Sequence, residues 1–278
     1  MAAILALASH LPATVRTIED IIEIVNERHG GVQHQYAPDG SIKKTVTPTR
    51  AAIMKFMGVE ERRIAGKGES NASLGYHAAQ KALAHAGYAG PIDGTICTTV
   101  ATGTYPSNAA RLHRALHGKK HCYAIDMTTP RTDPAGHATT LARELQAQRG
   151  GTYLVVREDA ATLLGECNDA TTASTDAEAL NKLLARRGLT GADLNGIIVE
   201  RRGATVAEQI EELLGIRTRT RFDLHAACAG FGYGLDAASA LLQRHPYLVV
   251  SSETLSRETD YSDANSPLFG DGAGAALV

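Results

Sequence analysis

Cys228 is the residue of this chain whose type and position best suit covalent chemistry. It lies in the run from Phe222 to Gly234, where a strand-like segment meets a helix made of small residues. A cysteine in the first turn of a helix faces unpaired backbone N–H groups and the positive end of the helix dipole, and both stabilise a thiolate. We therefore predict that Cys228 lies at the start of a helix and acts as a nucleophile. The alternative is that Cys228 is a small side chain packed in the core.

Helical and strand-like patterns alternate along the chain and indicate an α/β fold, in which helices cover a sheet. Helices are expected over residues 17–27, 73–86, 106–117, 135–148, 175–187, 205–214 and after Cys228, and strands over 2–8, 94–100, 121–127, 152–157, 195–199, 220–224 and 247–252. The polar segment 29–49, which contains Pro-Asp-Gly, is expected to be a loop.

The same order of helices and strands occurs twice. One series runs from Asn71 to Asp126 and the other from Thr172 to Asp223, with each aspartate inside a strand that precedes a helix. We predict two similar βα halves with mixed, mostly parallel sheets: residues 1–168 without a nucleophile, and residues 169–278 with Cys228. The alternative is that any two βα units look alike at this level.

Composition narrows the classes of function. The 28 basic and 30 acidic residues nearly cancel, so neither nucleic acid nor an anionic membrane is an expected partner. The four cysteines have neither the spacing of a metal site nor the density of a disulfide scaffold, which favours a reducing, cytoplasmic setting. No segment approaches the roughly 20 apolar residues of a membrane span, and residues 2–8 are too short for a signal peptide.

Several separated segments resemble β-ketoacyl-acyl carrier protein synthase III, a thiolase-like condensing enzyme. The resemblance is carried by Asp223 to Gly230 and by the closing run Leu268 to Val278. Tyr247 to Arg257 resembles the strand and loop that follow the nucleophile helix in that family. Leu11 to Thr17 and Met57 to Ala65 are similar to its opening segments. The matches occur in the family's order and are more specific than a glycine-rich loop alone.

The resemblance implies a thiolase-like fold and an acyltransferase of fatty acid or polyketide synthesis. Cys228 would take an acyl group from acyl-coenzyme A or a phosphopantetheine thioester, and malonyl-carrier protein would condense with it after losing CO₂. The resemblance implies no cofactor or metal beyond these substrates. Because condensing enzymes of this kind pair edge strands across a two-fold axis, a homodimer or a heterodimer with a related synthase is expected.

The resemblance also places residues near the substrate. Phe231 and Phe269 are expected to form walls of the acyl pocket, and Arg62 is retained in the entry segment. The aromatic residue that stacks on adenine in the family falls near Ala52, and the family's Asp-Arg pair appears here as Asp263-Ala264. A carrier protein or a short thioester could therefore be the donor.

Some groups of the family's site have no counterpart in these residues. Its catalytic histidine, asparagine and oxyanion loop lie downstream of the strand that Gly270 to Gly274 begins, and the sequence ends at Val278. His225 is expected to point away from the sulfur as a packed or surface histidine. The glycines of 270–274 are expected in a turn with positive φ, where the backbone approaches closely.

Two further functions stay open from the sequence. The chain could be a non-catalytic or half-site subunit that pairs with a complete synthase. It could also be a cysteine acyltransferase that forms esters or amides, which needs a general base more than an enolate-binding site.

Overall fold

The computed structural model describes residues 3–100, 114–115, 123–130, 136–156, 161–164, 170–172, 177–218 and 220–278. Nearly all of the expected helix at 106–117, together with Cys122 and Cys167, lies outside these residues. The helices are α1 (Ile18–His29), α2 (Arg50–Met57), α3 (Asn71–Ala86), α5 (His137–Arg149), α6 (Ala177–Ala185), α7 (Val206–Leu214) and α8 (Gly230–Leu241). The strands are β1 (Ala6–His10), β2 (Thr14–Thr17), β3 (Gln33–Tyr36), β4 (Ile42–Val46), β5 (Glu61–Ile64), β6 (Gly94–Thr98), β7 (Tyr123–Pro130), β8 (Thr152–Val156), β9 (Ala161–Leu164), β10 (Ala170–Thr172), β11 (Leu194–Gly203), β12 (Thr220–His225), β13 (Tyr247–Thr254) and β14 (Asp271–Leu277).

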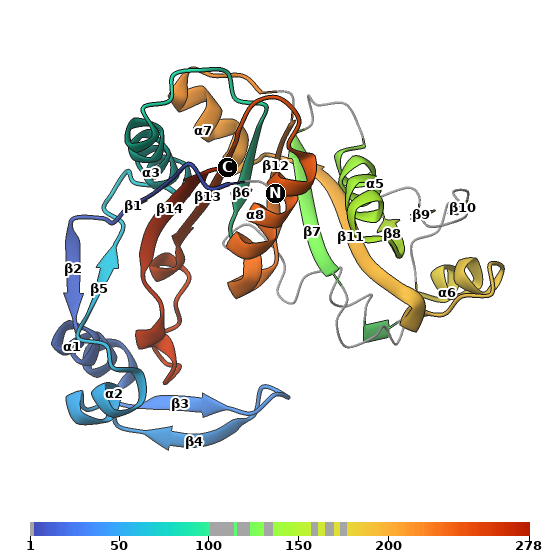
Figure 1. The fold of residues 1–278 in the computed structure, drawn as a ribbon. Coiled ribbons are helices and arrows are strands. Elements are labelled where there is room, and N and C mark those ends of the chain that lie inside the picture. Colours follow the sequence, from blue (N-terminus) through green and yellow to red (C-terminus); the bar gives the residue numbers. More distant parts are fainter. Residues whose placement is uncertain are drawn as a thin grey trace.

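One mixed sheet of ten strands runs through the molecule (Figure 1), in the order β1-β14-β13-β6-β12-β7-β11-β8-β9-β10. Strands are parallel within two blocks, β13-β6-β12 and β7-β11-β8. The blocks meet where β12 pairs antiparallel with β7, with Leu224 opposite Met127. Parallel strands place their carboxyl ends at one edge of the sheet, so the ends of β13, β6 and β12 lie together.

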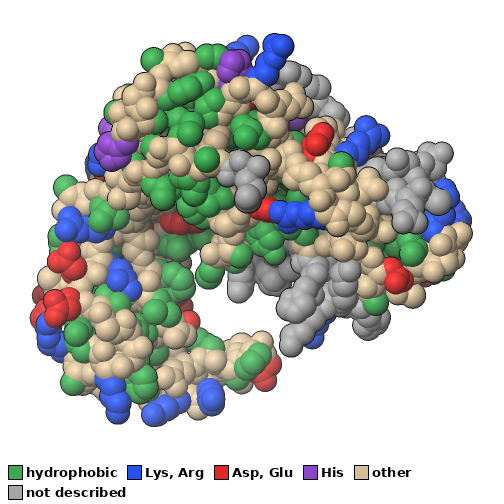
Figure 2. Space-filling view, in the orientation of Figure 1, with side chains coloured by type: hydrophobic (Ala, Val, Ile, Leu, Met, Phe, Trp, Pro, Cys, Tyr) green, Lys and Arg blue, Asp and Glu red, His purple; other side chains and the backbone are tan. Residues whose placement is uncertain are grey.

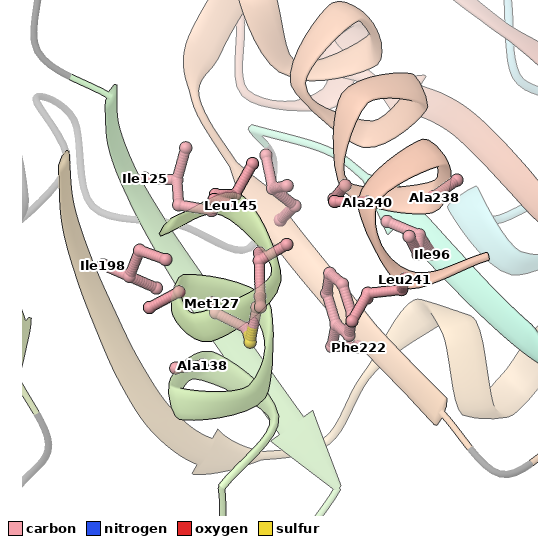
Figure 3. Close-up of a cluster of buried hydrophobic side chains, with 14 of the residues drawn as sticks. Ile96, Ile125, Met127, Ala138, Leu145, Ile198, Phe222, Ala238, Ala240 and Leu241 are labelled. Carbon is pink, nitrogen blue, oxygen red and sulfur yellow. The ribbon is translucent and has the colours of Figure 1, made fainter. Parts of the chain in front are cut away.

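Helices cover both faces of this sheet. The helices α3, α6 and α7 pack on one face, and α5 and α8 pack side by side on the other. Figure 3 shows the core under α5 and α8, where both parallel blocks contribute apolar side chains, among them Ile96, Ile125, Met127, Ile198 and Phe222. Strands buried on both faces read as continuous apolar runs, which is why the sequence predicted most of them.

The expectation of a polar loop over residues 29–49 is wrong. The strands β3 and β4 form a hairpin arm, and Figure 2 shows a hollow between this arm and the rest of the molecule. Gln33 anchors the arm, because its buried Nε2 donates to the carbonyl oxygens of Tyr261 (2.9 Å) and Asp263 (3.1 Å) and to Ser266 Oγ (2.9 Å). Strands this short and polar lack the apolar alternation by which strands are recognised.

The expectation of a positive-φ turn at residues 270–274 is also wrong. Gly272 and Gly274 lie within β14, and none of the three glycines of this run has a positive φ. Close packing explains Gly270 and Gly272 instead. A Cβ on Gly270 would lie 2.9 Å from Arg62 Cδ, and one on Gly272 would lie 3.0 Å from Leu11 Cδ2.

Strands of the two predicted halves alternate in the sheet. The strand β6 of residues 1–168 lies between β12 and β13, and β11 of residues 169–278 lies between β7 and β8. The division of the chain at residue 168 stays a prediction. Of the helices in the described residues, none is long and apolar enough to cross a membrane.

Candidate functional site

Cys228 lies at the carboxyl end of β12, in a 3₁₀ turn (Ala227–Ala229) that leads directly into α8. The sequence predicted Cys228 in the first turn of the helix, but the α-helix begins at Gly230, so the cysteine precedes it by two residues. The side chain is exposed, which does not fit a core cysteine. Ligands of open α/β sheets bind outside the carboxyl ends of parallel strands, and this is such a position.

The residue before the cysteine has a strained backbone. Ala227 has φ of 47°, and among the described residues it is the only non-glycine residue with positive φ. Such a conformation costs about 1–3 kcal/mol and persists only where the surroundings hold it. This backbone conformation produces a sharp strand-to-helix turn, and the next side chain, Cys228, is exposed at the carboxyl end of β12.

Two glycines of α8 bring the helix close to the sheet behind the cysteine. A Cβ on Gly230 would lie 3.4 Å from Thr98 Cβ, and one on Gly234 would lie 2.9 Å from both Thr98 Cγ2 and Val249 Cγ1. The helix therefore packs directly on β6 and β13, and this packing fixes where its amino end lies. Glycines four residues apart were the signal for this close approach in the sequence.

A hydrogen-bond network, most of it buried, joins the last residue of β12 to neighbouring elements. His225 Nδ1 donates to the carbonyl oxygen of Thr99 at 2.8 Å, and its Nε2 lies 3.1 Å from Thr128 Oγ1. Thr99 Oγ1 donates to Glu253 Oε2 (3.1 Å) and accepts from Asn71 Nδ2 (3.2 Å). His225 was expected to be a packed or a surface histidine, and the structure shows that it is buried. The sequence did not predict the roles of Thr99, Glu253 or Asn71, because their partners are distant along the chain.

The structure places Phe231 and Phe269 in different surroundings. Phe231, on α8, is partly buried against the core of Figure 3. Phe269 is 42% exposed and lies between a 3₁₀ turn (Ser266–Leu268) and β14. Arg62 Nε donates to the carbonyl oxygen of Pro267 at 2.9 Å, so Arg62 is bound to the turn that precedes Phe269. Partial burial lowers the pKa of the Arg62 guanidinium.

A cavity of ≈ 230 Å³ lies beside this junction, in the segment that follows β13. It is lined by Leu255, Glu258, Thr259, Asp260, Asp263, Ser266 and Phe269. Hydrogen bonds from the Ser262 hydroxyl and amide lower the pKa of Asp260, so this carboxylate is anionic at neutral pH. Of the four predicted site residues, the lining of this cavity includes Phe269 and none of Cys228, Phe231 and Arg62.

Two buried aspartates hold elements around the site. Asp271 accepts from the Ser256 amide (2.8 Å) and from the Ala65 amide (2.6 Å), which ties β14 to the segments after β13 and β5. Asp223 accepts from the amides of Val206 (2.7 Å) and Ala207 (2.9 Å), at the positive end of α7. A buried aspartate inside an apolar strand needs such partners, and that was the signal available in the sequence.

Cys97 is the other cysteine among the described residues, and it is fully buried in β6. Burial raises the pKa of its thiol well above the usual value, and the nearby Asp223 carboxylate adds to the shift. A protonated, inaccessible thiol is not a nucleophile. Within the described ranges, no three His, Cys, Asp or Glu side chains form a group that could hold a metal ion.

Comparison with known proteins finds similarity to one family at the cysteine segment. Residues 222–278 match the family model of 3-Oxoacyl-[acyl-carrier-protein (ACP)] synthase III. A β-ketoacyl-[acyl-carrier-protein] synthase III of Streptomyces glaucescens is 38% identical over 120 residues, which are 40% of this chain and 36% of that protein. One from Staphylococcus epidermidis is 49% identical over 78 residues, which are 27% of this chain and 24% of that protein. The chain thus spans about a third or less of the length of these relatives.

A solved structure supports the fold. The priming β-ketosynthase of the R1128 polyketide pathway superposes with a TM-score of 0.52 at 18% identity, covering 99% of this chain and 48% of that one. The mixed sheet between helix layers and this superposition show a thiolase-like α/β fold, as the sequence predicted. Within that fold, the matched segments of the chain are similar to β-ketoacyl-[acyl-carrier-protein] synthase III.

Proposed function

We propose that the protein is an acyltransferase of the β-ketoacyl-acyl carrier protein synthase III type, with Cys228 as the acylated nucleophile. The Cys228 thiolate attacks the carbonyl carbon of a thioester, the donor C–S bond breaks, and the donor leaves as a thiolate. Malonyl-carrier protein then loses CO₂, its carbanion attacks the acyl-cysteine carbonyl, and the Cys228 thiolate departs as the new C–C bond forms. The product is a 3-oxoacyl thioester of fatty acid or polyketide synthesis.

One observation supports this proposal above the others. Cys228 is an exposed thiol on a strained turn at the carboxyl ends of parallel strands, inside the segment that matches the family model. Each residue around it helps to present the sulfur: Ala227 sets the turn, and Gly230 and Gly234 set the helix. Cys97, by contrast, is buried inside β6 and lies outside the matched segment.

The cavity beside Phe269 bears on the donor. Three carboxylates, those of Glu258, Asp260 and Asp263, line it. Such a lining repels phosphate groups, which acyl-coenzyme A carries in greater number than the phosphopantetheine of a carrier protein and which pantetheine lacks. We therefore propose that a carrier-protein or short pantetheine thioester is preferred over acyl-coenzyme A. We propose that Phe269 and Phe231 form walls of the acyl pocket, with Phe231 near Cys228, and that Arg62 contacts the substrate beside the cavity.

Mass spectrometry tests the acylation step. The protein is incubated with acetyl-pantetheine or acetyl-coenzyme A and then digested with a protease. We expect one acetyl mass on the peptide that contains Cys228, formed faster from acetyl-pantetheine, and none on the peptide that contains Cys97. The variant Cys228→Ala should lose the adduct, while Cys97→Ala should keep it. An adduct that survives in Cys228→Ala, or no adduct where a control condensing enzyme is labelled, contradicts the proposal.

Product analysis tests the condensing step and its alternatives. With malonyl-carrier protein, the acylated protein should release CO₂ and a 3-oxoacyl product. Acylation without condensation would favour the half-site subunit, and transfer to an alcohol or amine would favour the ester- or amide-forming acyltransferase. Dimerisation through edge strands and a cytoplasmic setting stay predictions.

The strand β12, which precedes Cys228, pairs with β7 inside the sheet, so it is not an edge strand that could pair with a second subunit.

A further inference from the structure

We propose that His225 is a positioning residue for Cys228, an inference that rests on the proposed acyl transfer at that thiol. His225 is the last residue of β12, and only two alanines separate it from the cysteine. Its side chain is buried, whereas that of Cys228 is exposed, so the ring acts from inside the fold and not as a partner of the sulfur.

The imidazole ring binds the ends of two other strands. Its Nδ1 donates to the carbonyl oxygen of Thr99, the residue after β6, at 2.8 Å. A carbonyl oxygen only accepts, so Nδ1 carries the hydrogen. Its Nε2 lies 3.1 Å from the hydroxyl of Thr128 on β7. One side chain therefore joins the ends of β6 and β12 to the antiparallel neighbour β7.

Thr99 is itself held on two further sides. Glu253, on β13, accepts from the Thr99 hydroxyl (3.1 Å) and from the Val100 amide (2.7 Å). Asn71, the first residue of α3, donates to the same hydroxyl at 3.2 Å. Thr99, whose carbonyl oxygen accepts from His225, is thus held in place by hydrogen bonds to β13 and α3 at the end of β6.

The bond from His225 to the well-held Thr99 explains how the strained turn is maintained. Ala227 holds a positive φ, a conformation that relaxes unless the residues on either side are constrained. On the helix side the constraint is the contact of Gly230 and Gly234 with the sheet, and on the strand side it is His225. Without the ring, the end of β12 loses its bonds to Thr99 and Thr128, and the turn that presents Cys228 can relax.

The test compares three substitutions at this position. His225→Asn keeps a short N–H donor that can reach the Thr99 carbonyl, His225→Gln carries its amide further out, and His225→Ala has neither. Two rates are measured: alkylation of Cys228 by iodoacetamide, read on its peptide, and acylation of Cys228 at saturating acetyl-pantetheine. The concentration of donor at half-maximal rate is recorded as well.

We expect His225→Ala to lower the acylation rate about tenfold or more, because a small displacement of a reacting group relative to a bound donor costs this much. The alkylation rate should fall by a smaller factor, because the exposure of the thiol depends on the turn. The half-saturating donor concentration should change by less than about twofold, since His225 does not touch the donor. His225→Asn should restore both rates to within about threefold of the wild type, and His225→Gln should not.

Two outcomes overturn the proposal. One is a folded His225→Ala, with unchanged circular dichroism, that keeps wild-type rates. The other is an equal loss in the Asn and Gln variants, which also decides the question if His225→Ala does not fold. Should the wild-type protein accept no acyl group, the proposed function fails, and the alkylation rates still decide the role of His225.

Discussion

Cys97 and Cys228 are the same side chain in opposite surroundings. In β6, desolvation raises the pKa of the Cys97 thiol and no reagent can reach it. On the turn after β12, Cys228 is exposed and is followed at once by a helix. The difference lies in accessibility and backbone geometry, because both residues sit near the carboxyl end of the same parallel block.

His10 gives the molecule a specific loss of stability in mild acid. Desolvation, the nearby His77 ring (centroids 4.7 Å apart) and the Lys81 ammonium lower the pKa of His10. The unfolded state has the ordinary value, about 6.5, and therefore binds a proton first as the pH falls. Stability present above pH 6.5 is lost as the pH falls toward the lower folded value.

We predict that His10→Gln weakens this pH dependence. Urea unfolding at pH 8.0 and pH 5.5 should show a smaller decrease in the free energy of unfolding for the variant than for the wild type. An equal decrease in both proteins would mean that the folded and unfolded pKa values of His10 do not differ.

Among the elements, α8 can lie close to the sheet because one of its contact positions is a glycine. A methyl group at Gly234 would lie 2.9 Å from two side chains of the sheet, whereas one at Gly232 would have nothing within 4 Å. The two positions are two residues apart in one helix, so they form a matched pair in which only the contact with the sheet differs.

We predict opposite effects of alanine at these positions. Gly234→Ala should lower the free energy of unfolding by about 1–3 kcal/mol through overpacking. It should also slow alkylation of Cys228, because the helix must move. Gly232→Ala should raise stability by about 0.5–1 kcal/mol, as alanine does at an exposed helical site. Equal effects in urea unfolding would contradict the assigned packing of α8.

Most of the described helices and buried strands were predicted to within a few residues, because their apolar periodicity is a local property, but the short helix α2 (Arg50–Met57) was not predicted. The helix expected over 73–86 is α3 (Asn71–Ala86), and the strand expected over 220–224 is β12 (Thr220–His225). The arm of β3 and β4 was missed, since its stability comes from Gln33 and from contacts with residues more than 200 positions away.

At the scale of the whole molecule, the antiparallel pair β12–β7 joins two parallel blocks into one sheet. The core of Figure 3 crosses this boundary, with Phe222 and Leu224 on one side and Ile125 and Met127 on the other. A substitution that creates a cavity at this boundary should therefore lower the stability of both blocks, because they share one apolar cluster.

We predict that Met127→Ala lowers the free energy of unfolding by about 2–5 kcal/mol. Hydrogen exchange should quicken in both β6 and β11, which lie on opposite sides of the boundary. As a control, Leu213→Ala removes a side chain that is 49% exposed and should change stability by less than about 1 kcal/mol. Faster exchange in β11 alone would show that the blocks unfold independently.

The sequence by itself determined what depends on neighbours along the chain: the α/β class, the cysteine between a strand and a helix of small residues, and the family resemblance. Only the tertiary structure decided that Arg62 binds the Pro267 carbonyl, that the predicted halves alternate in one sheet, and that His225 joins three strands. These features are contacts between residues far apart in sequence, and their register is set by packing and by the need to satisfy buried polar groups, which no local pattern records.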